Sequence, residues 1–137
     1  MIRSPLEDTD LSLFKTVTPN DIVFFDGSHR SFQNSDVTVF FTEILPTLPL
    51  NTLVGVHDIF LPDDYPSDWL NRYYNEQYLL ACWILGGDRL KIELPVYYCC
   101  RLPEVYSSLD ELWSLLSIAP AQIIGGAMWF SCQDANS

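Results

Sequence analysis

Asp21-Ile-Val-Phe-Phe-Asp-Gly-Ser-His29 combines a buried-strand pattern with polar residues at its end. Its four consecutive apolar residues are typical of a short strand that is buried on both faces. The polar residues Asp26 and His29 follow where this strand would end. In open α/β sheets, ligands bind outside the carboxyl ends of the strands. We therefore predict a strand over Asp21 to Phe25 that ends on candidate functional residues.

A second stretch repeats this design. Thr52 to Val56 is another short apolar run, and it ends on His57 and Asp58. The intervening segment, Asn34 to Leu45, has the length and pattern of an amphipathic helix. A strand, a helix and a strand in this order form a right-handed unit with parallel strands. The two strand ends then lie at the same edge of the sheet, so Asp26 and Asp58 can converge on one pocket.

The predicted helix between the two strands has one apolar face. Its apolar residues recur with helical spacing, and this stripe is expected to pack on the sheet as core: Val37, Phe40, Phe41, Ile44 and Leu45. Asn34 or Ser35 would cap its start, and Pro46 and Pro49 would end it.

Composition limits the classes of function. The 137 residues suffice for one domain, 1–137, and nearly half of them are hydrophobic. The net charge of −11, with only seven scattered Lys and Arg residues, argues against binding to nucleic acid or to an anionic membrane surface. We expect a small-molecule substrate instead.

Location and redox state are predicted from what the sequence lacks. There is no apolar signal-peptide core near Met1 and no apolar run long enough to span a membrane. The four cysteines show no metal-binding spacing, and Cys82 falls in an apolar helical stretch. We therefore expect a cytoplasmic protein with buried, reduced thiols.

After the second strand, the sequence leaves two alternatives open for the loop that follows it and two for Glu76. The loop Ile59 to Pro66 either covers the pocket as a lid or packs Phe60 and Leu61 into the core. A helix is predicted from Ser67 or Asp68 to Gly86, where glycines end it. On this helix, Glu76 either faces the pocket and holds a substrate hydroxyl or, as is more common for a polar helix residue, is solvated.

The C-terminal part is predicted to complete the sheet. Arg89 to Glu93 alternates between polar and apolar residues, which is typical of a half-exposed strand. Ala127 to Phe130 is expected to be a final strand that pairs antiparallel with Leu90 to Leu94. A short helix is predicted over Leu109 to Leu116.

The residues at the two strand ends permit two kinds of chemistry. Asp26 and Asp58 are suitable ligands for a hard divalent cation such as Mg²⁺. Alternatively, His29 or His57 could take a proton from a substrate hydroxyl, because imidazole titrates near neutral pH. A hydrolase is a weaker interpretation, since Gly27-Ser28-His29 does not match the G-x-S-x-G nucleophile turn.

Three segments together resemble a known family. They are Asp21 to His29, then Val56 to Pro62 with Asp64 to Pro66, and then Asn75 to Leu80. In order and spacing they are similar to motifs of class I S-adenosylmethionine-dependent methyltransferases, and most of all to the group called methyltransferase family 24.

The resemblance implies a Rossmann-like α/β sheet in which parallel strands are followed by a C-terminal antiparallel pair and flanked by helices. The chain would correspond to the C-terminal half of such an enzyme, with Ile2 and Arg3 at the end of its third strand. The implied activity is O-methyl transfer to a small molecule or a sugar hydroxyl. By this resemblance His29, Asp26 and His57 are catalytic, and Asp26 and Asp58 bind the metal.

The chain also departs from this family. It contains no glycine-rich turn of the kind that binds S-adenosylmethionine, so no cofactor-binding residue is assigned. The alternative is a non-catalytic, truncated domain that acts as a binding or oligomerisation module. Because the strand at Asp21 to Phe25 would lack a neighbour, its apolar edge is expected to form a homodimer or to pair with a missing N-terminal half.

Overall fold

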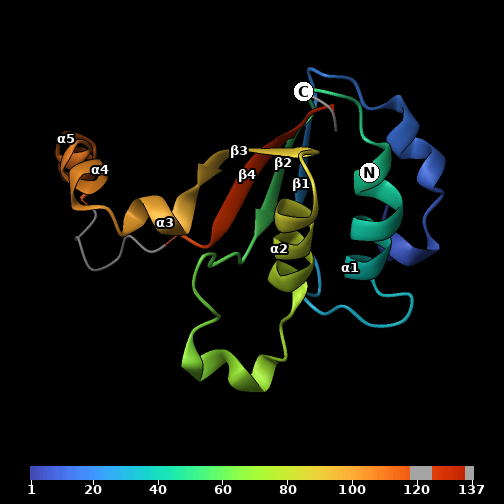
Figure 1. Cartoon of the computed structure of the whole chain (residues 1–137), viewed down its shortest axis with the longest axis horizontal. Helices are drawn as coiled ribbons and strands as arrows, with labels where there is room; N and C mark the ends of the chain where they lie inside the picture. The colour runs from blue at the N-terminus through green and yellow to red at the C-terminus, as the bar shows by residue number, and fades with distance from the viewer. Residues whose placement is uncertain (118–124, 135–137) are drawn as a thin grey trace.

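A four-stranded mixed sheet lies at the centre of the molecule (Figure 1). The computed structural model describes residues 1–117 and 125–134. The strands are β1 (Ile22–Phe25), β2 (Leu53–His57), β3 (Leu90–Pro95) and β4 (Ala127–Cys132), in the spatial order β1-β2-β4-β3. The α/β class predicted from the sequence is therefore confirmed.

The pairing of the strands also follows the prediction. β1 and β2 are parallel, with Phe25 opposite Val56, so their carboxyl ends lie at one edge of the sheet. β4 runs antiparallel to both β2 and β3, with an irregularity in its pairing with β3 between Ile92 and Leu94. The predicted antiparallel pair at the C-terminal end of the chain is thus present.

The segment between β1 and β2 is one helical stretch with three geometries. It comprises α1 (Asp36–Val39), a π-helical turn η3 (Phe40–Ile44) and a 3₁₀ turn η4 (Leu45–Thr47). The Ser35 side chain caps it by accepting a hydrogen bond from the Thr38 N–H. All five residues of the predicted apolar stripe are buried, and they form the core together with the inner face of the sheet.

The single long helix that was predicted to end at Gly86 is two shorter ones. A 3₁₀ helix, η5 (Ser67–Arg72), is followed by Tyr73, which adopts a left-handed conformation with φ of 57°. The helix α2 (Glu76–Gly86) then starts in a new direction. The prediction was wrong here because the apolar spacing continues across a left-handed residue that breaks the helical backbone.

The N-terminal segment forms two short 3₁₀ helices, η1 (Leu6–Asp8) and η2 (Leu11–Thr16), and Leu6, Leu11 and Phe14 pack against the core. Ile2 and Arg3 have no strand conformation, so the implied end of a third strand is not found there.

After β3 the chain leaves the sheet. Figure 1 shows α3 (Val96–Cys100), α4 (Pro103–Ser107) and α5 (Asp110–Leu115) extending away from the strands as an arm. The helix predicted over Leu109 to Leu116 is confirmed by α5. The four cysteines are all free, as predicted, but only Cys132 is buried and Cys82 is exposed, so the prediction of buried thiols was wrong for most of them.

One edge and one face of the sheet are open. Among the residues that the structure describes, β1 pairs with β2 alone. Ile22 is 62% exposed and Phe24 is 51% exposed, although Phe24 stacks on Trp129 with ring centroids 5.5 Å apart. An apolar strand with a free edge is prone to association. Dimerisation or pairing with a further segment through β1 stays a prediction.

Residues 1–117 and 125–134 include no helix with the length and apolarity needed to cross a bilayer.

Candidate functional site

The ends of β1 and β2 bring four polar side chains together. Nε2 of His29 lies 3.5 Å from a carboxylate oxygen of Asp26 and 3.5 Å from one of Asp58. Nδ1 of His57 lies 3.4 Å from Asp26 and 3.3 Å from Asp58. The structure therefore gathers every site residue that the sequence predicted at one edge of the sheet.

The turn after β1 is fixed by α1. The carboxylate of Asp36 accepts hydrogen bonds from the Ser28 N–H at 2.6 Å and from the Ser28 hydroxyl at 2.5 Å. A Cβ atom on Gly27 would collide with Asp36 and with the ring of Phe25, so only glycine fits this close approach. Ser28 thus shapes the turn that carries the cluster.

Two of the clustered residues have strained backbones. His29 has φ of 60° and Asp58 has φ of 53°, in the left-handed region that non-glycine residues seldom occupy. Such a conformation costs about 1–3 kcal/mol per residue and persists only where its surroundings enforce it. Backbone strain of this kind is typical of functional sites. The sequence alone did not reveal this strain.

Three consecutive polar residues at the start of α2 hold both loops of the site. The backbone N–H of Asn75 donates to the His29 carbonyl, and its side-chain oxygen accepts from the Ser31 N–H. The side-chain oxygen of Gln77 accepts from the Phe60 N–H at 2.9 Å, in the loop that follows β2. Asn75 and Gln77 therefore fasten the loops after β1 and β2 to one helix.

Glu76, between them, lies in a different environment from the one that the sequence favoured. Solvation was the favoured expectation, yet its side chain is fully buried and its Oε1 is hydrogen-bonded to Nδ1 of His29. Its Oε2 has no hydrogen-bond partner within the described parts of the chain. The interruption of an apolar helix surface by Asn75-Glu76-Gln77 was the signal that could have placed it inside.

Burial and charge change the pKa values of this pair. Burial alone would lower the pKa of His29, but the hydrogen bond and charge of Glu76, with Asp58 and Asp26 nearby, raise it above its usual value. Burial raises the pKa of Glu76, and His29 offsets only part of that increase. The two side chains therefore hold a proton between them more tightly than isolated groups would.

His57 occupies a different environment. Its side chain is 44% exposed and its ring meets the edge of Phe24. Its Nδ1 atom is buried and, within the described residues, makes no hydrogen bond of good geometry despite facing two carboxylates. A buried ring nitrogen without a donor or acceptor is a suitable metal ligand.

The cluster can be tested for its fit to a metal ion. Single ligand atoms of Asp26, His29 and His57 all lie within 4.8 Å of one another. Bonds from a metal to histidine and carboxylate are about 2.0–2.2 Å long, so neighbouring donors around one ion lie about 3 Å apart. A carboxylate oxygen of Asp26 lies 3.5 Å from Nε2 of His29 and 3.4 Å from Nδ1 of His57, which fits this spacing after a small contraction, whereas Asp58 is not part of this converging group among the described residues.

The donor set bears on which metal is suitable. Mg²⁺ prefers oxygen ligands alone, whereas imidazole together with carboxylate suits Mn²⁺, Fe²⁺ or Zn²⁺. Asp26 and Asp58 alone would match Mg²⁺, as the sequence predicted. The converging group of Asp26, His29 and His57, with two imidazoles and one carboxylate, fits a transition-metal ion better.

The loop after β2 packs inward. Ile59 and Phe60 are buried, and Phe60 contacts the rings of Tyr65, Trp69 and Tyr97, while Leu61 is half-buried. Of the two alternatives for this loop, core packing therefore holds for Phe60.

Comparison with protein-family models, with curated proteins and with solved structures finds no match. The geometry of the site is therefore the basis for a functional proposal.

Proposed function

We propose that this chain provides the acceptor-binding half of an S-adenosylmethionine-dependent O-methyltransferase acting on a small molecule or sugar hydroxyl. The observation that carries the proposal is the convergence of Asp26, His29, His57 and Asp58 at the carboxyl ends of two parallel strands. This is the edge of an α/β sheet where ligands bind.

His29 is the proposed base. When Glu76 is ionised and His29 is neutral, the carboxylate accepts the hydrogen bond of Nδ1–H, which leaves Nε2, 3.5 Å from Asp26 and Asp58, to take up a proton. Nε2 can then accept the proton of an acceptor hydroxyl placed between these carboxylates. Glu76 is a positioning residue, because it acts on the acceptor only through the imidazole.

Asp26 and His57 are proposed to hold a divalent cation, with Asp58 beside them as a further carboxylate, and the cation would lower the pKa of the acceptor hydroxyl when bound. Without a cation, the two carboxylates can still orient that hydroxyl by accepting its hydrogen bond. His57 can also serve as an alternative base.

The sheet order supports this proposal. An antiparallel strand, β4, lies between β2 and β3, and this fits the antiparallel pair expected for a Rossmann-like methyltransferase sheet. S-adenosylmethionine would supply the methyl group. These 137 residues include no glycine-rich turn to hold it, so the proposal assigns cofactor binding to another segment of the same gene product.

The test measures both binding and transfer. The chain as its natural gene encodes it is titrated with S-adenosylmethionine by calorimetry, and transfer of a labelled methyl group to a panel of polyhydroxylated acceptors is followed. We expect transfer to fall by about 10²-fold or more in His29→Gln, the usual contribution of a general base. Absence of both heat and transfer with the unmodified chain would refute the proposal.

A second candidate is a non-catalytic module that binds a partner or a second copy. The free edge of β1 and the exposed Ile22 and Phe24 favour it. Light scattering discriminates: Phe24→Lys should convert a dimer to monomer if this edge is an interface. A monodisperse monomer of the unmodified chain would count against self-association.

A further inference from the structure

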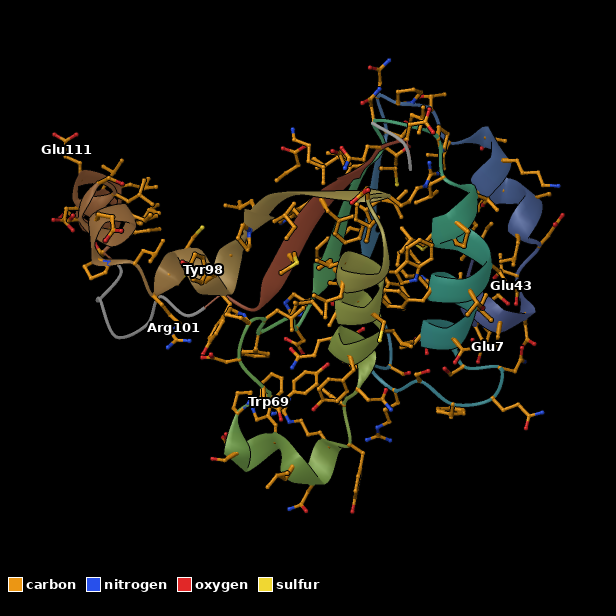
Figure 2. The ribbon with its side chains drawn as sticks, viewed as in Figure 1. Glu7, Glu43, Trp69, Tyr98, Arg101 and Glu111 are labelled. Carbon is orange, nitrogen blue, oxygen red and sulfur yellow. The ribbon has the colours of Figure 1, made fainter. Side chains whose placement is uncertain are left out.

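A second pocket lies beside the cluster, between the loop after β2 and the start of α2. It has a volume of about 270 Å³ and is lined mainly by aromatic side chains together with one carboxylate: Tyr65, Trp69, Tyr74, Tyr78 and Asp64. In Figure 2, Trp69 projects from η5 towards the part of the molecule that holds α2. Nothing in the proposed transfer chemistry uses this pocket.

The aromatic rings of the pocket pack against one another edge to face. Tyr65 meets Tyr74 at 77° and Tyr78 at 87°, with centroids 6.0 and 5.8 Å apart. Trp69 meets Tyr74 at 84° with centroids 5.6 Å apart. Aromatic faces carry negative electrostatic potential, so a ring face that remains open to the pocket attracts positive charge.

The negative charge near the pocket also favours the binding of a cation. Asp64 lines it and accepts a hydrogen bond of 2.6 Å from the Tyr78 hydroxyl, and no Lys or Arg side chain is among the lining residues. The two hydrogen bonds to Asp64, from Tyr78 and from the Tyr65 N–H, lower the pKa of this carboxyl. The net charge of the chain, −11, also favours cations in the surrounding solution.

A cation of the chain itself already contacts this aromatic cluster. The guanidinium carbon of Arg72 lies 3.8 Å from the ring centroid of Trp69 and 5.6 Å from that of Tyr74. Arg72 is exposed and reaches the rings from the surface. This cation–π contact shows that the ring faces of Trp69 and Tyr74 are accessible to a positively charged group.

We propose that this pocket binds the ammonium group of a small organic cation. Its volume is slightly below the range of about 300–1,000 Å³ that accommodates drug-sized ligands, so it fits a single cationic head group. Tyr74 forms one wall and its ring centroid lies 4.5 Å from that of His29. The remainder of the ligand would therefore extend towards the cluster at the strand ends.

Cation binding goes beyond the methyltransferase function and does not rest on it. Binding of a cation needs neither S-adenosylmethionine nor a metal ion, so it can be measured where no transfer occurs. If transfer fails and binding succeeds, only the proposed reaction is refuted.

The test compares choline with its neutral isostere, 3,3-dimethylbutan-1-ol. Both are titrated into the chain in the presence of a chelator and followed by ¹H–¹⁵N NMR. We expect choline alone to saturate, with shifts confined to residues 64 to 78. Asp64→Asn and Trp69→Ala should each weaken choline binding by about tenfold, whereas Asp88→Asn, a carboxylate outside the pocket, should leave it unchanged.

A further variant, Arg72→Gln, removes the cation of the chain itself that contacts Trp69. We expect it to tighten choline binding. Equal binding of the neutral isostere, shifts centred elsewhere or no saturation by choline in the folded wild-type chain would each overturn the proposal. Circular dichroism of every variant separates lost binding from lost folding.

Discussion

The two histidines of the cluster lie near the ends of neighbouring strands and yet differ in almost every physical respect. His29 is buried, lies on a left-handed backbone and is hydrogen-bonded to the buried carboxylate of Glu76. His57 is the last residue of β2, its side chain is almost half exposed, and its Nδ1 has no hydrogen-bond partner among the described residues. Both nevertheless face Asp26 and Asp58.

The contrast shows how two histidines in one cluster can have different chemical roles. A base must have one ring nitrogen held so that the other is free to accept a proton, and only His29 meets this condition. A metal ligand needs an unengaged nitrogen next to other donors. Nδ1 of His57 lies beside two carboxylates, and because our proposal reserves Nε2 of His29 for the acceptor proton, His57 is the proposed ligand. Identical side chains thus acquire separate roles through their partners.

The largest expected difference between the two histidines is in stability. His29→Ala leaves Glu76 buried without its partner, and loss of one member of a buried pair costs about 3–5 kcal/mol. His57→Ala removes a half-exposed ring and should lower the free energy of unfolding by less than about 1 kcal/mol. Urea denaturation followed by circular dichroism measures both. Equal losses would erase the distinction between the two sites.

A second expected difference concerns metal binding. His57→Ala and Asp58→Asn should each weaken the binding of Mn²⁺ by about 10–100-fold, whereas His29→Ala should change it only slightly. Calorimetry with Mn²⁺ on the folded variants provides the measurement. If His29→Ala weakens binding as much as His57→Ala does, His29 is a ligand and cannot be the base.

The smallest expected effect is a dependence of stability on pH. Folding raises the pKa of both His29 and Glu76, so the folded chain holds their protons more tightly than the unfolded chain. The stability gained from this is fully present below the unfolded pKa values, of which the lower is that of Glu76. It is lost as the pH rises through the raised pKa of His29.

We therefore expect the free energy of unfolding to fall as the pH rises from about 5 to 9. Glu76→Gln should flatten this dependence, and His57→Gln should keep it. Chelator is present throughout so that metal binding does not contribute. A wild-type stability that increases with pH over this interval would contradict the assignment of a shared proton to His29 and Glu76.

Much of the site was predictable because it depends on local pattern and on topology. Short apolar runs at Ile22–Phe25 and Leu53–His57 specify strands, and a helix between them makes the strands parallel. Parallel strands must end at the same edge of the sheet. The approach of Asp26 to Asp58 follows from that rule alone.

Other features depended on contacts between distant residues. Glu76 lies 47 positions from His29 in the sequence, and nothing in its local pattern shows that its partner is a histidine. The helix break at Tyr73 likewise cannot be predicted from the spacing of apolar residues. It lets Asn75, Glu76 and Gln77 turn inward, where they bind the two loops.

The α/β class, the parallel strands and the polar residues that end them are encoded in the sequence pattern, because side-chain periodicity and chain connectivity are local properties. The difference between His29 and His57 arises only in the tertiary structure. There the carboxylate of Glu76, from α2, is buried against the ring of His29, and burial with such a partner sets the tautomer and the pKa of an imidazole.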